Sequence, residues 1–194
     1  MSKSDPTAAK KERNKTIRWV ITVFFVTIFV SGVISLLSDA IMENSGIVVA
    51  FIILLLIVVV GIIFDIIGVA VTSADEKPFH SMAARKVVGS HEAIALLRKA
   101  ERVSSICNDV VGDICGVVSG SASATIAAQV IAKTDFGWPQ LITLAMSALV
   151  AGLTVGGKAI GKTIAIDSCV TIVYGVGKVV YILRRLPKIL LGKK

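Results

Sequence analysis

The side chains that could do chemistry lie inside long apolar segments of the sequence. Asp65 comes late in one uncharged run, and Asn108, Asp109 and Asp113 open another. Ionisable groups within a membrane segment are costly and normally face an interior cavity or pathway. Asp109 and Asp113 are four residues apart and so share one helical face, unless Asp109 only begins the helix at the membrane edge. Because carboxylate and amide oxygens suit a hard cation such as magnesium, these residues are predicted to form a cation site.

A stripe of small and hydroxyl residues follows these acids. It consists of Gly112, Gly116 and Gly120, interleaved with Ser119, Ser121 and Ser123. Small residues spaced by four allow two membrane helices to pack closely. The same face could instead offer hydroxyl and carbonyl oxygens to an ion. The sequence leaves both interpretations open.

Three further patterns do not predict a site. Residues 156–163 match the phosphate-loop pattern G-x-x-x-x-G-K-[ST], but that loop needs a buried strand before it and an α/β domain around it. The thiols lack C-x-x-C spacing and are predicted to fill space: Cys107, Cys115 and Cys169. Two isolated histidines are predicted to lie at the surface or in packing: His80 and His91. We therefore expect no nucleotide, no catalytic residue and no enzymatic activity.

The elements that must position these residues are membrane helices. The chain has 194 residues, of which 55% are hydrophobic and 18% charged, against about 45–50% and 25% in soluble domains. Each of four runs is long enough to cross a bilayer, which needs roughly 20 apolar residues. The predicted fold class is an all-α integral membrane protein with spans at about 16–38, 46–71, 106–132 and 137–157. This class excludes a soluble enzyme, a disordered chain and a nucleic-acid binder.

The distribution of basic residues predicts the orientation of the spans. The net charge is +8, yet every Lys and Arg except Lys133 precedes the first span, joins the second to the third, or follows residue 157. The positive-inside rule places these segments, and both termini, in the cytoplasm. Trp19 and Trp138 stand where interfacial aromatic residues are expected. We predict a multi-pass protein of the plasma membrane.

The remaining segments are expected on the cytoplasmic side. Residues 1–15 are predicted to be a disordered basic terminus, and 16–38 an additional N-terminal anchor. Between the second and third spans we expect a helical hairpin, with one helix ending near Val88, a break at Gly89 and a second helix from about Glu92 to Val103. Residues 163–190 have polar side chains on one face, which favours an in-plane amphipathic helix. The alternative is a fifth span that would carry the basic tail across the membrane.

Several segments, in order, resemble one known family. They are 64–71, Gly89 at the hairpin turn, Glu101 with Arg102, Gly112-Asp113 followed by 121–125, and 157–166. Together they resemble the transmembrane domain of the CNNM/CorC/CorB family, which is linked to magnesium and cobalt transport. The resemblance covers about residues 47–190. It implies a homodimer that moves or senses a divalent cation such as Mg²⁺.

The resemblance also implies a ligand set. The family's metal-binding Ser, Asn and Glu correspond to Asp65, Asp113 and Lys158. We expect Lys158 to act as an internal counter-charge to the two acids. The family's paired CBS domains are not in this sequence, so regulation through them is expected to be lost or to be supplied by a separate regulatory chain. The alternative function is a non-transporting membrane scaffold or accessory subunit in which Lys158 neutralises the acidic site.

Overall fold

All the regular structure is helical in the part of the chain that the structure, a computed structural model, describes: residues 6–43, 45–134 and 137–190. The α-helices are α1 (Pro6–Glu43), α2 (Ile47–Ser73), α3 (Lys77–Ala84), α4 (Ser90–Leu97), α5 (Ala100–Ser105), α6 (Asp113–Lys133), α7 (Pro139–Asp167) and α8 (Cys169–Leu190). A π-helix, η1 (Ile106–Gly112), joins α5 to α6. The predicted all-helical class is confirmed.

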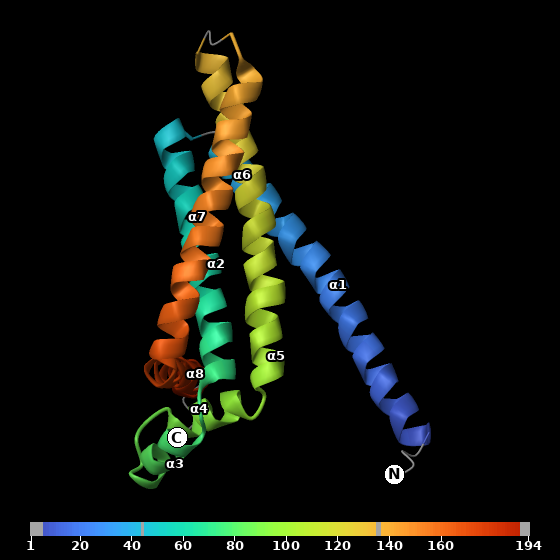
Figure 1. Cartoon of the computed structure of the whole chain (residues 1–194), viewed down its shortest axis with the longest axis vertical. Helices are drawn as coiled ribbons and strands as arrows, with labels where there is room; N and C mark the ends of the chain where they lie inside the picture. The colour runs from blue at the N-terminus through green and yellow to red at the C-terminus, as the bar shows by residue number, and fades with distance from the viewer. Residues whose placement is uncertain (1–5, 44, 135–136, 191–194) are drawn as a thin grey trace.

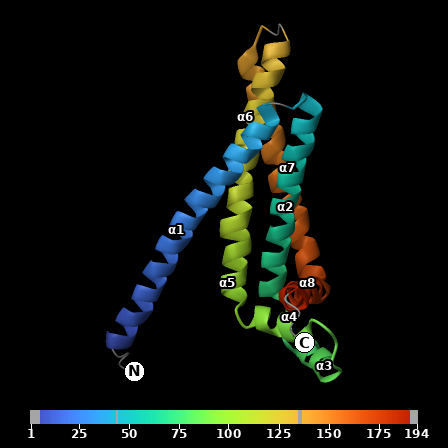
Figure 2. The ribbon, with the colours of Figure 1, turned by 180° about the vertical axis from the view of Figure 1, so that it is seen from behind.

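Four helical segments are long and apolar enough to cross a membrane: Ile17–Met42, Ile47–Ser73, Ala100–Lys133 and Pro139–Asp167. Three of them run side by side, whereas α1 meets the others near its C-terminal end and leans away from them (Figures 1 and 2). Large apolar side chains such as Phe29, Val48 and Leu144 face outward. A helix satisfies its own backbone hydrogen bonds, and such a surface suits lipid. The chain is therefore consistent with a multi-pass membrane protein.

Two apolar clusters hold the bundle together. One lies where α1, α2, α6 and α7 meet and includes Met42, Leu54 and Ile126. The other joins α2 to the hairpin and to α8, and includes Val71, Phe79 and Val173. The hairpin and α8 are therefore packed onto the bundle.

Several helix boundaries differ from the sequence prediction. α1 begins at Pro6, so residues 6–15 are helical where disorder was predicted; residues 1–5 lie outside the described part. A proline suits the first turn of a helix, and the segment after it continues without a break into the apolar run. α7 runs to Asp167 rather than 157, because no strong helix breaker follows Lys158. The third span begins at Ala100 rather than near residue 106.

The connection between α2 and α5 is a helical hairpin with shorter helices than predicted. α3 ends at Ala84 instead of Val88, and α4 ends at Leu97 instead of Val103. The turn between them contains two residues with positive φ, Lys86 at 56° and Gly89 at 89°. The Ser90 hydroxyl donates to the Val87 carbonyl at 2.6 Å. This turn places α4 against α8.

α8 crosses the end of the bundle, where it is seen end-on at the base of α7 (Figure 1). Its Gly177 is buried. A Cβ added there would lie 2.6 Å from the Gly89 carbonyl oxygen and 3.0 Å from the Ala93 nitrogen. Glycine is therefore needed at this crossing because the two backbones approach closely.

Gly89→Ala is expected to destabilise the protein by about 1–3 kcal/mol, since it combines a left-handed backbone conformation with overpacking. The added Cβ would lie 2.8 Å from the Lys178 backbone nitrogen. Thermal unfolding of the detergent-solubilised chain measures the loss. The matched control is Gly175→Ala, because a Cβ there meets nothing within 4 Å. Equal effects of the two substitutions would contradict the close crossing of α8 and the hairpin.

Candidate functional site

The centre of the candidate site is an ion pair between two membrane helices. Lys158 on α7 places its Nζ 3.8 Å from Asp65 Oδ1 on α2, with the lysine side chain 28% and the aspartate side chain 18% exposed. The helices approach closely here, since a Cβ on Gly161 would lie 2.7 Å from Ile66 Cγ1. Each charge offsets the cost of burying the other.

Asn108 brings an unpaired oxygen against α2 at Gly68. Its Oδ1 is buried and accepts no hydrogen bond within the described chain, while its Nδ2 donates to Ser104 Oγ at 3.4 Å. The amide oxygen faces Gly68, where a side-chain methyl group would overlap it. Gly68 lies about one helical turn beyond Asp65. A buried acceptor without a partner costs about 1–3 kcal/mol, and Gln129 Oε1 is a second such acceptor among the described residues.

The π-helix η1 is the third element that contributes to the site, beside α2 and α7. Asn108 and Gly112 belong to η1, and a Cβ built on Gly112 would lie 3.5 Å from Lys158 Nζ. The lysine ammonium therefore reaches from α7 to the η1 backbone. π-helical turns are rare and are often found at functional sites. The result is a small polar region formed by α2, η1 and α7.

The predicted cluster of three carboxylates does not form. Asp109 and Asp113 have exposed side chains, and the described residues contain no group of three acidic, His or Cys side chains that could hold a metal ion. Asp109 and Asp113, four residues apart, share a helical face as predicted, but that face is exposed. Asn108 and Gly112, also four residues apart, lie on the face that meets α2 and Lys158. Asn108, rather than Asp109 or Asp113, faces α2.

The three serines of α6 separate onto two faces. Ser119 and Ser123 are each 2% exposed, and each donates to a carbonyl of its own helix at 2.9 Å. They line a cavity of about 230 Å³ between α6 and α7, which Ser147 and Thr154 also line. Ser121 points instead toward α1. The serines therefore do not gather around Asp65.

A polar contact between α1 and α6 was missed by the sequence analysis. Ser121 Oγ and Thr125 Oγ1 donate to the Asp39 carboxylate at 3.3 and 3.4 Å. Gln129 Nε2 donates to the Met42 carbonyl at 2.8 Å. The available signal was three polar residues spaced by four on α6, which together form one helical face. These hydrogen bonds fasten the C-terminal end of α1.

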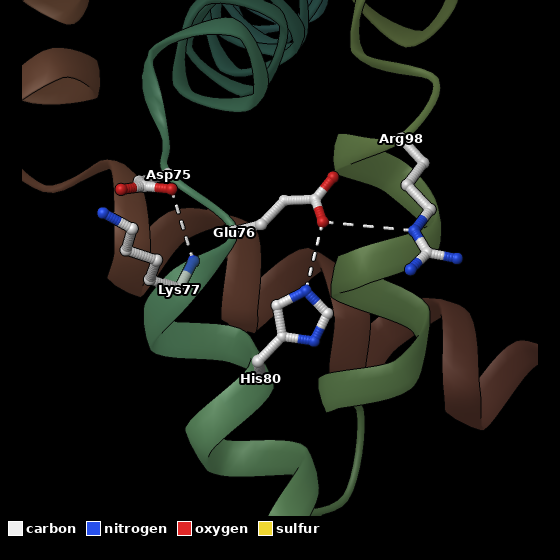
Figure 3. Close-up of polar contacts among 5 residues, drawn as sticks. All are labelled: Asp75, Glu76, Lys77, His80 and Arg98. Carbon is white, nitrogen blue, oxygen red and sulfur yellow. Dashed lines mark hydrogen bonds and ion pairs between the residues drawn. The ribbon is translucent and has the colours of Figure 1, made fainter.

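The hairpin carries a separate surface network. Figure 3 shows Glu76 between His80 and Arg98, with Glu76 Oε2 3.2 Å from His80 Nε2 and 4.0 Å from Arg98 Nε. The Lys77 backbone N–H donates to Asp75 Oδ1 at 3.3 Å. His80 and His91 are both exposed. The network ties the start of α3 to the end of α4.

The phosphate-loop-like segment 156–163 lies inside α7. Helical backbone N–H groups are engaged in the helix and cannot surround a phosphate as a loop does. All three cysteines are free thiols: Cys107, Cys115 and Cys169. Neither pattern adds a group to the polar region.

Comparisons of the chain with protein-family models, with curated proteins and with solved structures find no match. The fold and its apolar spans define the class of protein, a helical protein with four candidate membrane spans. Its distinguishing feature is the polar region formed by Asp65, Asn108 and Lys158.

Proposed function

We propose that the protein moves or senses a divalent cation at Asp65 and Asn108, as the resemblance to CNNM/CorC/CorB proteins implies. The observation that supports this most is the Asn108 Oδ1 atom, which is buried and unpaired. It lies against Gly68 of α2, about one helical turn from Asp65. An amide oxygen and a carboxylate are ligands suited to Mg²⁺, which retains water for its remaining positions. Asp109 on η1 and Asp113 at the start of α6, both exposed, would attract the cation toward the site.

Lys158 has a specific part in this proposal. Its ammonium lies against the Asp65 carboxylate, where it stands in for a bound cation. A divalent cation binds there only when the ammonium moves away, because like charges in a low-dielectric site repel strongly. Lys158 therefore acts as a built-in competitor that limits occupancy.

The proposed orientation follows from the charges. The start of α5 carries Lys99 and Arg102, and α8 carries Lys178 and Arg185; the positive-inside rule places such segments in the cytoplasm. α8 then lies in the plane of the plasma membrane with its polar face toward water. Under this arrangement both termini are cytoplasmic.

Cation flux into liposomes tests the proposal. With Mg²⁺, Co²⁺ and Mn²⁺, Asp65→Ala and Asn108→Ala are expected to abolish or strongly reduce flux through the reconstituted chain. The matched control is Asp167→Asn, which changes an exposed acid at the end of α7. Unchanged flux in both site variants would overturn the proposal.

The ion pair favours a second candidate function. Because Lys158 lies 3.8 Å from Asp65, the site is already neutral, as expected of a non-transporting scaffold or accessory subunit. Such a protein would work with a separate regulatory chain. The scaffold function predicts that no divalent cation stabilises the wild-type chain or a Lys158→Gln variant. The transport proposal predicts that a divalent cation stabilises the Lys158→Gln variant.

We propose that a second copy of the chain packs against the glycine stripe of α6. Gly112 is buried, but Gly116 and Gly120 are exposed, and a Cβ on either would meet nothing within 4 Å. Both glycines border the cavity between α6 and α7, so this small-residue face is left unfilled within one protomer. Faces of this kind allow close packing between membrane helices.

Gly120→Leu is expected to shift the protein from dimer to monomer, because the larger side chain separates the two helices. Single-molecule photobleaching in liposomes measures the oligomeric state. Gly32→Leu on α1 is the control, since a Cβ there also meets open space. A dimer fraction that stays equal in both variants would exclude this interface.

A further inference from the structure

α1 packs against the bundle mainly through its C-terminal end, and Trp19 makes a further contact near the other end. Its C-terminal part is held by the hydrogen bonds of Asp39 with Ser121 and Thr125, and Met42 is fully buried. Across residues 17–37, by contrast, no side chain is buried. The helix leans away from the bundle over this stretch (Figures 1 and 2). A surface of this kind inside a membrane must be covered by something apolar.

An apolar cavity lies where α1 converges on the bundle. It has a volume of about 240 Å³ and is lined by side chains of α1, α2 and α6: Ile34, Leu56, Ile57, Val60, Ile114, Cys115 and Val118. No charged side chain lines it. Its chemistry suits a hydrocarbon chain.

A basic cavity lies at the junction of α4 and α5. It has a volume of about 610 Å³ and is lined by residues 97–102, which include Arg98, Lys99 and Arg102 with Glu101 as the only acid. Arg98 is shared with Glu76. Among the described residues, Lys99 and Arg102 take part in no ion pair. These two cations are therefore available to an anionic group.

Trp19 connects this basic cavity to α1. The Arg102 guanidinium carbon lies 5.6 Å from the centre of the Trp19 ring. Tryptophan marks the level of lipid headgroups in membrane proteins. From Trp19 to Ile34 the helix advances roughly 22 Å at 1.5 Å per residue, a distance that an extended acyl chain can follow.

We propose that an anionic phospholipid binds between α1 and the bundle, from the leaflet on the hairpin side. Lys99 and Arg102 bind its phosphate, since basic residues at the membrane surface attract anionic headgroups. An acyl chain follows the half-exposed inner side of α1 and ends in the cavity at Ile34. This site is independent of the cation site and does not rest on its function.

Quenching of Trp19 fluorescence tests the proposal. The full chain carries Trp138→Phe so that Trp19 is the only tryptophan, and it is titrated in detergent with phosphatidylglycerol bearing brominated acyl chains. Phosphatidylglycerol is expected to quench at lower concentration than phosphatidylcholine with the same chains. Equal quenching by the two lipids would overturn the proposed headgroup contact.

Charge variants locate the headgroup. Lys99→Gln with Arg102→Gln is expected to weaken phosphatidylglycerol binding by about fivefold per cation, or roughly 25-fold together. The matched control is Arg85→Gln with Lys86→Gln, which removes the same two residue types from the exposed hairpin turn. An equal loss in the control would show diffuse surface attraction instead of a site.

Two further measurements locate the acyl chain. Val60→Phe, which fills the cavity, is expected to weaken both lipids while keeping their ratio, and an unchanged affinity for both would overturn the placement of the chain. Glycerol phosphate, which is the headgroup without acyl chains, is added as a competitor. It is expected not to displace the brominated lipid, so that Trp19 fluorescence stays quenched. Complete displacement by glycerol phosphate would show a free-phosphate site and contradict the lipid.

Discussion

Lys158→Ala is expected to lower the free energy of unfolding by about 2–3 kcal/mol, slightly less than the 3–5 kcal/mol for breaking a fully buried pair. The pair keeps some exposure and spans 3.8 Å, which accounts for the smaller figure. Without the ammonium, Asp65 remains in the membrane segment as an uncompensated charge. Thermal and denaturant unfolding in detergent measure the change.

Two matched variants separate this pair from general effects of charge. Lys162→Ala removes an exposed lysine one turn further along α7 and is expected to change stability by less than about 0.5 kcal/mol, as at other surface positions. Asp65→Ala combined with Lys158→Ala is expected to recover part of the loss, because no charge remains buried alone. Equal losses in Lys158→Ala and Lys162→Ala would contradict the role of the pair.

Gly68→Ala is expected to destabilise the protein by about 1–3 kcal/mol through overpacking against Asn108. A methyl group at Gly68 would overlap the Asn108 amide oxygen, so α2 and η1 must separate or the amide must turn away. The same displacement is expected to reduce cation flux. Unfolding and flux are measured on the same preparation.

The control for Gly68→Ala is Gly152→Ala. A Cβ on Gly152 would meet nothing within 4 Å, and alanine favours a helix over glycine by up to about 1 kcal/mol. Stability is therefore expected to stay level or rise slightly. A fall in stability as large as that of Gly68→Ala would show that the close approach at Asn108 is not the cause.

The four membrane helices could be predicted because charge-free runs of this length have few alternatives. The span of α2 was predicted at 46–71 and is found at Ile47–Ser73. The two agree closely because polar residues flank the apolar run on both sides. The end of α7 was placed too early. Its last turns contain Lys158 and Lys162, and hydropathy alone does not distinguish the end of a membrane span from the end of the helix that contains it.

The contents of the site were predicted less well than its position. Asp65 and Lys158 were both selected, and the structure places them in contact. Asn108 was selected as one of a group with Asp109 and Asp113, yet it alone faces α2. Hydropathy does not show which side of this polar start of the third span meets α2. The contact of Asp39 with Ser121 and Thr125 was not predicted, because these partners lie more than 80 residues away in the sequence.

Cation binding to the purified chain tests the central claim most directly. Mg²⁺, Co²⁺ and Mn²⁺ are titrated into wild type, Lys158→Glu and Asp65→Ala while the unfolding temperature is recorded, because a ligand that binds only the folded state raises it. Lys158→Glu exchanges the competing ammonium for a further oxygen ligand and is predicted to be stabilised more than wild type. Asp65→Ala is predicted not to respond. If the Lys158→Glu variant unfolds at the same temperature with and without each cation, that result would contradict a cation site at Asp65 and Asn108.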